Sequence, residues 1–557
     1  MKLADIRNET VKHKNMRDAY YKILNFIKSD RCYNGIVEIL YGLRRTGKTT
    51  IMEQLVMNNS NDISFLFIQA DKNDTMDDIY NRLDKAIEDN VKCVLIDEIT
   101  FVSDFIDNSA ALADIYAKEG LRIILAGTDS LSFIFAEKGS LYDRTEHIST
   151  TYVPFEEHCR VLNTTNIDDY ISFGGLMKKD ENAQNPKDKR VVYDYSSAKT
   201  YLDEAVTQNI SHSIEKLSHF ANNTKLMKVT KEEMRSVIEK VVEKYSGIIN
   251  QDVVNNQLNK VIVSAPVNQE RLRELEEQSV IKNLIANKAN ILHEFVQTIN
   301  ADTNIEHKFD DDMILSLENE LIGLGFLSVT NKQELLISDE FGYRNEPLAK
   351  EYYIIQPAIK YHHLVKALDF IDEKEYYQKL SESGRNYFKN RIENQIKGDM
   401  TEQIIVYETS KALSTERYSV YKVCFRNATA PNKDLGEYDM LVYDKQQNCC
   451  WGFEIKHSSQ TNPAQYKNLT NEKFKDAVNY MYGNIERLCV LYNGESFLNE
   501  NDILYLNLSD FVKAISDKKD VQLALFSLNK NLSQRNVEEE NKDLDKTNST
   551  NNNNSLK

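Results

Sequence analysis

The sequence predicts an α/β protein that begins with a parallel β-sheet covered by helices on both faces. Five short apolar runs mark the expected strands, at residues 36–41, 63–69, 93–97, 122–127 and 148–153. Amphipathic stretches between them mark the expected helices, at residues 48–57, 76–89, 108–118 and 130–136. Parallel strands need a crossover, usually a helix, so this alternation predicts a parallel sheet. We expect its ligand beyond the carboxyl ends of the strands.

The length of 557 residues corresponds to roughly three or four domains of ~100–200 residues. Composition and pattern predict six segments along the chain. They are an N-terminal arm and helix at 1–32, the sheet domain at 33–175, a helical and winged-helix-like region at 176–360, a helical connector at 361–397, a second α/β domain at 398–526, and a polar tail at 527–557 that we expect to be disordered.

Composition argues against several classes of protein. No run of ~18 uncharged apolar residues occurs, so we expect no membrane span, and the charged N-terminus indicates no export. Seven cysteines without a C-x-x-C pair indicate reduced thiols and a cytoplasmic location. The net charge of −17 argues against non-specific nucleic-acid binding over the whole surface, because phosphate contacts need clustered Lys and Arg. A local basic face is still compatible with this charge.

A phosphate-binding loop follows the first apolar run. Gly42, Gly47, Lys48 and Thr49 fall at the spacing G-x-x-x-x-G-K-[ST]. The glycines let backbone N–H groups approach phosphate oxygens, and the start of the next helix adds partial positive charge. We expect Lys48 to reach the β- and γ-phosphates of ATP and Thr49 to bind Mg²⁺. The residues expected to contact the nucleotide are Gly42, Leu43, Arg44, Arg45, Thr46, Gly47, Lys48, Thr49 and Thr50.

Two carboxylates end the third apolar run, Cys93-Val94-Leu95-Ile96. Asp97 is suited to the Mg²⁺ shell, and Glu98 is suited to polarise a water for attack on the γ-phosphate. Two acids at a strand end are, alone, often only an exposed strand terminus. Because these follow the phosphate loop by about fifty residues, we interpret them as catalytic.

The fourth run ends in small polar residues. Thr128 is predicted to sense the γ-phosphate, and Asp129 or Ser130 to cap the following helix. A cap alone is the alternative for this stretch. Arg144, just before the fifth run, is predicted either to contact a phosphate, in the same or a neighbouring subunit, or simply to be exposed.

These motifs resemble a known family. The sequences YGLRRTGKTT, LIDEI, LAGTDS and YVPFEEH resemble the bacterial and archaeal ATPases of the additional-strand, catalytic-glutamate branch of the AAA superfamily, over residues 33–175. Phe173-Gly174-Gly175 resembles the glycine pair after that core. The resemblance implies a P-loop NTPase sheet in which the Thr128 strand lies between the phosphate-loop strand and the Asp97 strand. Many members carry a nuclease-like C-terminal domain.

The middle region is less informative. Residues 198–281 contain several helical patterns, and 311–324 reads as a helix followed by a β-hairpin from 326–329 and 334–337. This combination is consistent with a winged helix. Such a module either binds DNA or packs against the ATPase core, and we favour packing.

The C-terminal region carries a second set of charged residues. Glu402 lies on an expected helix, Asp439 on an expected strand, and Glu454 and Lys456 on the next strand. Residues two apart in a strand share a face, so Glu454 and Lys456 point together. The three carboxylates are suited to bind Mg²⁺, and the lysine to position a water or stabilise developing charge.

This arrangement resembles the PD-(D/E)XK fold of restriction-endonuclease-like nucleases. Asp439, Glu454 and Lys456 stand at its D…E-x-K positions, and Glu402 at its helix acid. The motif's proline is absent from Glu437-Tyr438-Asp439. Three lysines on the following segment are predicted either to contact phosphates or to be solvated: Lys467, Lys473 and Lys475.

The sequence therefore predicts a Mg²⁺-dependent ATPase coupled to a nuclease-like domain that acts on DNA. The alternative is an ATP-dependent switch or scaffold whose C-terminal domain binds a protein partner and cuts nothing. A small-molecule kinase uses the same loop, but Glu98 beside Asp97 favours water as the acceptor. A homo-oligomer would allow Arg144 to act in a neighbouring subunit.

Overall fold

The computed structural model describes residues 14–164, 166–177, 190–216, 229–242, 311–338, 342–347, 351–372, 378 and 382–530. The predicted N-terminal arm, most of the helical pattern between 217 and 281, and the tail after 530 lie outside these residues. The chain divides into two compact units, which are Met1–Ser328 with Tyr353–Ile396, and Val329–Tyr352 with Lys397–Lys557.

The first unit is built on a five-stranded parallel sheet of order β2-β3-β4-β1-β5. The strands are β1 (Val37–Tyr41), β2 (Phe65–Gln69), β3 (Cys93–Asp97), β4 (Arg122–Gly127) and β5 (Thr145–Ser149). The predicted parallel sheet is confirmed. The strand that precedes Thr128, β4, lies between β1 and β3, as the family resemblance implied.

The fifth strand lies earlier in the chain than predicted. We expected residues 148–153, but β5 spans Thr145–Ser149 and pairs with β1 from Val37↔Thr145 onward. The sequence of β5 is Thr-Glu-His-Ile-Ser, and within it only Ile148 is a buried apolar residue. β5 is an edge strand, so apolar patterning marks it poorly.

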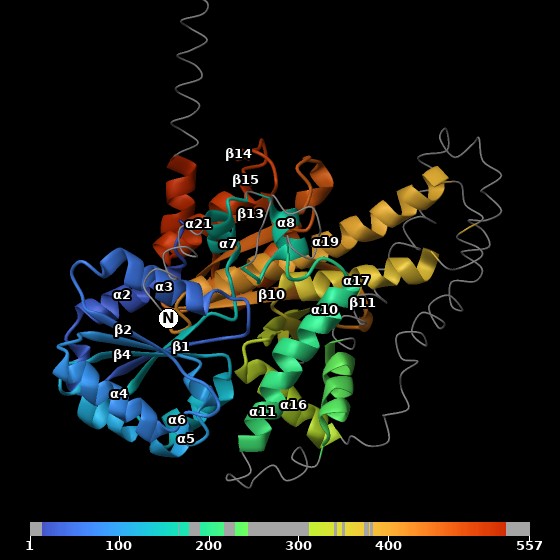
Figure 1. Cartoon of the computed structure of the whole chain (residues 1–557). Helices are drawn as coiled ribbons and strands as arrows, with labels where there is room; N and C mark the ends of the chain where they lie inside the picture. The colour runs from blue at the N-terminus through green and yellow to red at the C-terminus, as the bar shows by residue number, and fades with distance from the viewer. Residues whose placement is uncertain are drawn as a thin grey trace, which may run out of the picture. The chain divides into compact units, whose positions relative to one another are not determined.

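Successive side chains of the strands enter two different cores. Val37, Ile39, Val94, Ile96, Ile123 and Leu125 belong to one core, and Leu40, Leu95, Ile124 and Ala126 belong to the other. The first core contains α4 (Met76–Glu88), α5 (Phe105–Asn108), η3 (Leu112–Ala117) and α6 (Ser130–Lys138), and the second contains α2 (Asp18–Lys28) and α3 (Lys48–Asn59). These two helix groups cover opposite faces of the sheet (Figure 1).

This unit contains further helices. η1 (Arg31–Asn34) precedes β1, and η2 (Ile99–Phe101) follows β3. After β5 come α7 (Phe155–Leu162), α8 (Ile167–Phe173), α10 (Tyr195–Tyr201), η4 (Leu202–Thr207), α11 (Gln208–Lys216), α16 (Asp311–Gly323) and α17 (Pro357–Asp372). Residues 231–242 are also helical. The elements α10, η4 and α11 form one continuous helical segment. It places residues that are distant in sequence from the strands next to the sheet domain.

The hairpin predicted after α16 does not form. β6 (Leu327–Thr330) pairs with β9 (Glu351–Ile354), whereas β7 (Lys332–Ser338) pairs with β8 (Gly342–Pro347) and β10 (Tyr418–Asn427). A single residue separates β6 from β7, which is too short for a hairpin turn. The helix-and-hairpin arrangement expected of a winged helix is therefore absent from the described part of this segment.

The second unit contains an eight-stranded mixed sheet of order β14-β15-β13-β12-β11-β10-β7-β8. Its other strands are β11 (Ala430–Asp444), β12 (Cys449–Ile455), β13 (Asn484–Tyr492), β14 (Phe497–Leu498) and β15 (Leu504–Asn507). Its helices include η8 (Pro463–Tyr466), α20 (Glu472–Tyr482) and α21 (Leu508–Lys518), and residues 521–530 form a helix that runs into the predicted tail.

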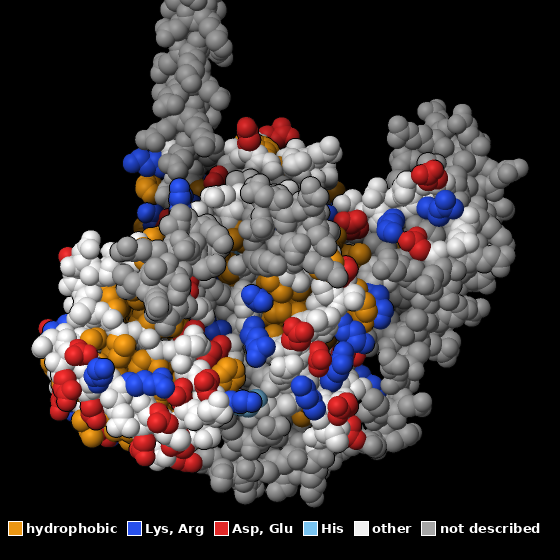
Figure 2. Space-filling model, in the orientation of Figure 1, with side chains coloured by type: hydrophobic (Ala, Val, Ile, Leu, Met, Phe, Trp, Pro, Cys, Tyr) orange, Lys and Arg blue, Asp and Glu red, His pale blue; other side chains and the backbone are white. Residues whose placement is uncertain are grey.

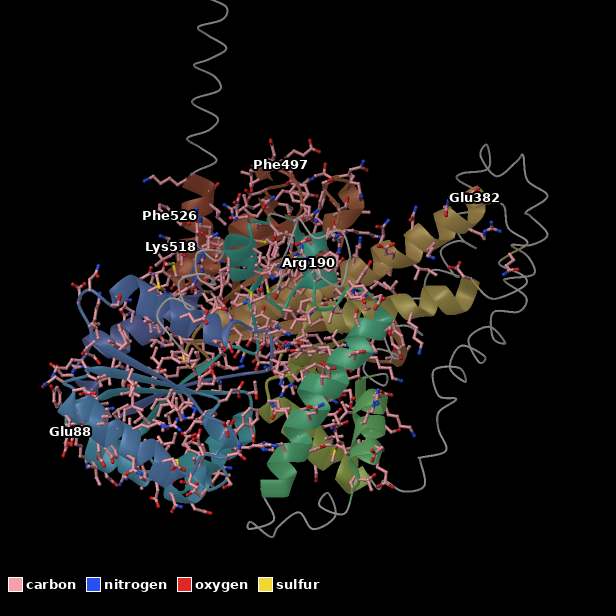
Figure 3. All side chains as sticks on the ribbon, in the orientation of Figure 1. Glu88, Arg190, Glu382, Phe497, Lys518 and Phe526 are labelled. Carbon is pink, nitrogen blue, oxygen red and sulfur yellow. The ribbon has the colours of Figure 1, made fainter. Side chains whose placement is uncertain are left out.

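One long helix, α19 (Glu382–Ala412), precedes this sheet. Figure 3 labels its first residue, Glu382, and also the last residue of α21, Lys518. The boundary between the two compact units falls inside α19, after Ile396. The residues at its C-terminal end, such as Ile405, pack into the core of the second unit, so α19 presents Glu402 to that unit.

Candidate functional site

The phosphate loop, residues 42–47, joins β1 to α3 at the carboxyl edge of the first sheet. Its backbone needs glycine at both ends, because Gly42 has φ 147° and Gly47 has φ 91°, which strain any residue with a Cβ. A Cβ on Gly42 would lie 2.5 Å from Thr150 Oγ1 and 2.7 Å from Thr151 N. The positive φ of the backbone and the lack of room for a Cβ therefore both require glycine at position 42.

The Lys48 side chain folds into this loop. Its Nζ donates to the carbonyl oxygens of Gly42 at 2.7 Å and Leu43 at 3.0 Å. Burial lowers the pKa of Lys48 to about 8, against the opposing effect of the Glu98 and Asp97 carboxylates. Phosphate oxygens would compensate this ammonium better than two carbonyl dipoles, because hydrogen bonds between charged groups are stronger.

Thr49 and Asp97 come together across the sheet edge. Thr49 Oγ1 donates to Asp97 Oδ2 at 2.9 Å, and Asp97 is only 1 % exposed. Burial raises the pKa of Asp97, although the Thr49 hydrogen bond and Lys48 oppose the shift. A hydroxyl oxygen beside a carboxylate is an oxygen donor set suited to a hard divalent cation, so these two residues fit Mg²⁺.

Glu98 lies next to this pair in an unusual backbone conformation. Its φ is 55°, which few residues other than glycine adopt, and its N–H donates to Asp97 Oδ1 at 3.0 Å. Thr128 Oγ1 donates to Glu98 Oε2 at 3.4 Å. Burial raises the pKa of Glu98, against the effect of Lys48. A carboxylate with increased proton affinity beside the phosphate loop is suited to accept a proton from water.

The residues after β4 are tied to α11. Asp129 caps α6, because its Oδ1 accepts from Ser132 N at 3.0 Å. Asn209 Nδ2 donates to the carbonyl oxygen of Thr128 at 2.5 Å, and His212 Nδ1 lies 3.2 Å from Asp129 Oδ2. The sequence did not predict this link, because nothing local in α11 identifies a partner about eighty residues earlier in the chain.

A buried ion pair beside the loop was also missed. Arg17 Nε lies 2.9 Å from Glu157 Oε1, and Arg17 Nη2 lies 2.9 Å from Glu157 Oε2. Both side chains are almost fully buried, at 6 % and 3 % exposed. Glu157 belongs to the YVPFEEH sequence, but no pattern in the sequence pairs it with an arginine 140 residues away.

Arg144 is not brought to the phosphate loop. It immediately precedes β5, and its carbonyl accepts from the N–H of Val37 at the amino end of β1. Its side chain forms an ion pair with Asp114. The loop begins at the other end of β1, about 16 Å away for five residues of strand. The predicted phosphate contact within one subunit therefore does not form.

The second unit gathers four carboxylates and two lysines, which we call the acid–lysine cluster. Its members are Glu402 on α19, Lys422 on β10, Glu437 and Asp439 on β11, Glu454 on β12, and Lys456 directly after β12. The sequence identified four of these residues. It missed Lys422 and Glu437, because charged residues on half-exposed strands are common.

Lys456 bridges the two strand carboxylates. Its Nζ lies 2.8 Å from Glu454 Oε1 and 3.1 Å from Asp439 Oδ2. Asp439 Oδ2 also accepts from the N–H of Ile455 at 2.7 Å. Burial, together with the neighbouring Asp439 carboxylate, raises the pKa of Glu454 to about 8 against the effect of Lys456.

Lys422 makes the matching bridge on the helix side of the cluster. Its Nζ lies 2.5 Å from Glu402 Oε1 and 3.3 Å from Glu437 Oε2. Burial raises the pKa of Glu402 to about 8, against the effect of Lys422. Burial opposes the charge on Lys422, but Glu402, Glu437 and Asp439 together raise its pKa well above the usual value.

The cluster fits Mg²⁺ through two residues rather than three. Among the described residues, no three His, Cys, Asp or Glu side chains form a ready metal site, so the predicted Glu402, Asp439 and Glu454 trio is not formed as a cage. Glu454 Oε2 is nevertheless buried and has no hydrogen-bond partner in the described structure. Mg²⁺ is commonly held by one or two carboxylates plus substrate phosphates, which Asp439 and Glu454 match.

The lysines after β12 are less distinctive. Lys475 lies on α20 with its Nζ 3.0 Å from Glu472 Oε1, Lys473 is also on α20, and Lys467 follows η8. On the first unit, Figure 2 shows acidic and basic side chains mixed over the surface formed by α4. Phosphate contacts need clustered Lys and Arg, whereas the two charges are interspersed on this surface.

Comparison with known proteins identifies one part of the chain. Residues 34–159 match the family model of an AAA domain, which comprises P-loop ATPases. A search of curated proteins finds no match. None of the described helices is both long and apolar enough to cross a membrane. The similarity covers the phosphate loop, Asp97, Glu98 and Thr128, and it indicates nucleotide binding and ATP hydrolysis for this domain.

Proposed function

We propose that this chain is a Mg²⁺-dependent ATPase, on the premise that residues 34–159 resemble an AAA domain. The observation that carries the proposal is the 2.9 Å contact between Thr49 and Asp97, with Glu98 directly beside it. The phosphate loop, the two proposed Mg²⁺ ligands and the proposed base therefore lie at one edge of the same sheet. The seven free cysteines support a cytoplasmic setting.

Each residue has a separate role in this proposal. Residues 42–50 hold the triphosphate through backbone N–H groups, and Lys48 neutralises the β- and γ-phosphates. Thr49 and Asp97 hold Mg²⁺. The bound ion neutralises charge on the phosphate oxygens. Thr128 senses the γ-phosphate, because its hydroxyl already contacts Glu98.

Glu98 acts as the base. A water oxygen forms a bond to the γ-phosphorus, and the bond from that phosphorus to the bridging oxygen breaks, which yields ADP and phosphate. The water proton passes to the Glu98 carboxylate. The raised pKa of Glu98 favours this transfer.

Two variants test these assignments. Lys48→Ala is expected to abolish ATP binding, whereas Glu98→Gln is expected to bind ATP and lose hydrolysis. Fluorescent-nucleotide titration measures binding, and released phosphate measures turnover. Another phosphorylated product in place of free phosphate would indicate a kinase instead.

For the second unit we propose a nuclease-like site of the PD-(D/E)XK kind that acts on DNA and is coupled to the ATPase. The support is the burial of Asp439 and Glu454 side by side with Lys456, and the unpartnered Glu454 Oε2. Asp439 and Glu454 would hold Mg²⁺ and Lys456 would position the attacking water. Glu402 is linked to the cluster through Lys422.

The competing candidate is a scaffold whose second unit binds a protein partner and cuts nothing. It is favoured by the lysine bridges, which already neutralise the carboxylates that a metal would need. Linear and circular DNA, incubated with and without Mg²⁺, separates the two candidates. Cleavage that Asp439→Ala and Lys456→Ala both abolish supports the nuclease, and no cleavage of either DNA supports the scaffold.

We also propose that Arg144 contacts a phosphate in a neighbouring subunit. The support is its position at the amino end of β5, far from the loop of its own subunit. A homo-oligomer would be needed for this contact. The mass of the protein in solution with a slowly hydrolysed ATP analogue tests the requirement.

A further inference from the structure

Successive carbonyl groups of the phosphate loop accept hydrogen bonds from outside the loop. The carbonyl oxygen of Arg44 accepts from the Tyr201 hydroxyl at 2.8 Å. The carbonyl oxygen of Arg45 accepts from the backbone N–H of Met177, also at 2.8 Å. Both donors lie far along the chain from the loop, at the end of α10 and after α8.

The next carbonyl, that of Thr46, accepts from Arg17 Nη1 at 2.6 Å. The same nitrogen lies 3.3 Å from the carbonyl of Thr150, and Nη2 lies 3.4 Å from the carbonyl of Tyr152. With its two bonds to Glu157, Arg17 uses all five guanidinium N–H donors. Lysine cannot reproduce this set, since an ammonium has three donors and no planar fork.

These contacts determine the direction of the loop's N–H groups. In a trans peptide the C=O of one residue and the N–H of the next point in opposite directions. When the carbonyls of residues 44–46 are held by outside donors, the N–H groups of residues 45–47 are turned to the opposite side. Several N–H groups on one side of a loop form a concave anion site.

We propose that Arg17, Met177 and Tyr201 form a loop clamp that preorganises the phosphate loop for the triphosphate. All three lie outside residues 34–159, so the clamp is an addition to the AAA domain. This inference rests on the proposed ATPase function. Arg17 and Tyr201 are positioning residues, because they act on the nucleotide through the loop backbone.

The buried environment of Tyr201 keeps its hydroxyl group protonated and able to donate a hydrogen bond. The side chain is 5 % exposed, and burial raises the pKa of its hydroxyl, which therefore stays protonated. Water has little access to replace a hydroxyl removed at this position. Tyr201→Phe should then release the Arg44 carbonyl while it keeps the packing of the ring.

The test is the affinity of the full-length Tyr201→Phe variant for ATP. Loss of one hydrogen bond that orients the loop should weaken ATP binding about three- to tenfold. The kcat at saturating ATP should stay within about twofold of the wild-type value, because Glu98 is untouched. Arg17→Lys should weaken binding more, if the variant folds.

Tyr170→Phe is the matched control. The Tyr170 hydroxyl donates to the carbonyl of Val153 at 2.6 Å, so this variant also loses a buried hydroxyl–carbonyl bond, but not one that a loop carbonyl accepts. It should lower the melting temperature about as much as Tyr201→Phe and leave the Kd for ATP unchanged. Wild-type affinity in Tyr201→Phe, or equal weakening in both variants, overturns the clamp. Failure of wild-type protein to bind ATP would instead overturn the proposed function.

Discussion

At the scale of single residues, neighbouring carboxylates at the β3 end differ in their surroundings. Asp97 is almost fully buried and its Oδ2 accepts from Thr49, whereas Glu98 turns away in a left-handed conformation toward Thr128. One carboxylate is thereby fixed and the other is left at the sheet edge. This division suits a metal ligand and a base, and the strained φ of Glu98 is the kind of feature that clusters at functional sites.

Another acid, Glu38 on β1, gives a prediction about pH. It is 3 % exposed, and burial, reinforced by Glu146, raises its pKa to about 7 from the usual 4.5. Between these two pH values the folded protein keeps a proton that the unfolded chain has released. The free energy of unfolding therefore falls as pH rises through this window.

Glu38→Gln stays neutral throughout, so it should be more stable than the wild type at about pH 8, by up to ~3 kcal/mol. The difference should shrink as pH falls and vanish well below about pH 4.5, where the wild-type carboxyl is protonated in both states. Urea unfolding at several pH values measures it. Wild-type and variant stabilities that run parallel over this range would show that Glu38 ionises normally.

At the scale of elements, the phosphate loop depends on contacts with several segments. Gly42 abuts the residues after β5, and Thr46 Oγ1 lies 2.8 Å from Thr150 Oγ1. The end of β4 is tied in turn to α11 through Asn209. A movement of the loop or of Thr128 on nucleotide binding would therefore be transmitted to α10 and α11 through these hydrogen bonds and packing contacts.

Gly42→Ala tests the fit of the loop. The added Cβ meets Thr150 Oγ1 at 2.5 Å, and the φ of 147° is strained for alanine. Strain of this kind corresponds to a loss of about ten- to hundredfold in ATP affinity. Calorimetric titration with ATP measures it.

Gly398→Ala is the control for that substitution. Gly398 lies inside α19, and a Cβ there meets nothing within 4 Å. Alanine should stabilise the helix by ~0.5–1 kcal/mol and leave ATP affinity unchanged. Equal ATP affinities for the Gly42→Ala variant and the wild type would mean that the loop tolerates a side chain at that position.

At the scale of the whole molecule, the contacts made at the ends of parallel strands were predictable from the sequence. Asp97 ends β3, and Thr49 lies just after the loop that follows β1. The carboxyl ends of parallel strands meet at one edge of a sheet, so the contact between these two residues was foreseeable. Arg17, Asn209 and Lys422 were not foreseeable, because each depends on a partner distant in sequence or on a neighbouring strand.

The errors have related causes. β5 is a polar edge strand, so apolar patterning did not locate it. A single residue separates β6 from β7, which leaves no room for the predicted hairpin turn, and the two strands pair with other strands instead. For Arg144 the sequence left a phosphate contact and simple exposure open, and the structure places it at the amino end of β5 with its side chain paired to Asp114. Apolar periodicity thus located β1 to β4 well, and it located the polar edge strand β5 poorly.

The most direct test of the ATPase assignment is phosphate release by purified Glu98→Gln at saturating ATP, with binding measured on the same sample. The predicted result is a loss of turnover of at least ~100-fold, the usual contribution of a general base, with ATP still bound. Wild-type turnover in Glu98→Gln would contradict the assignment of Glu98 as the base.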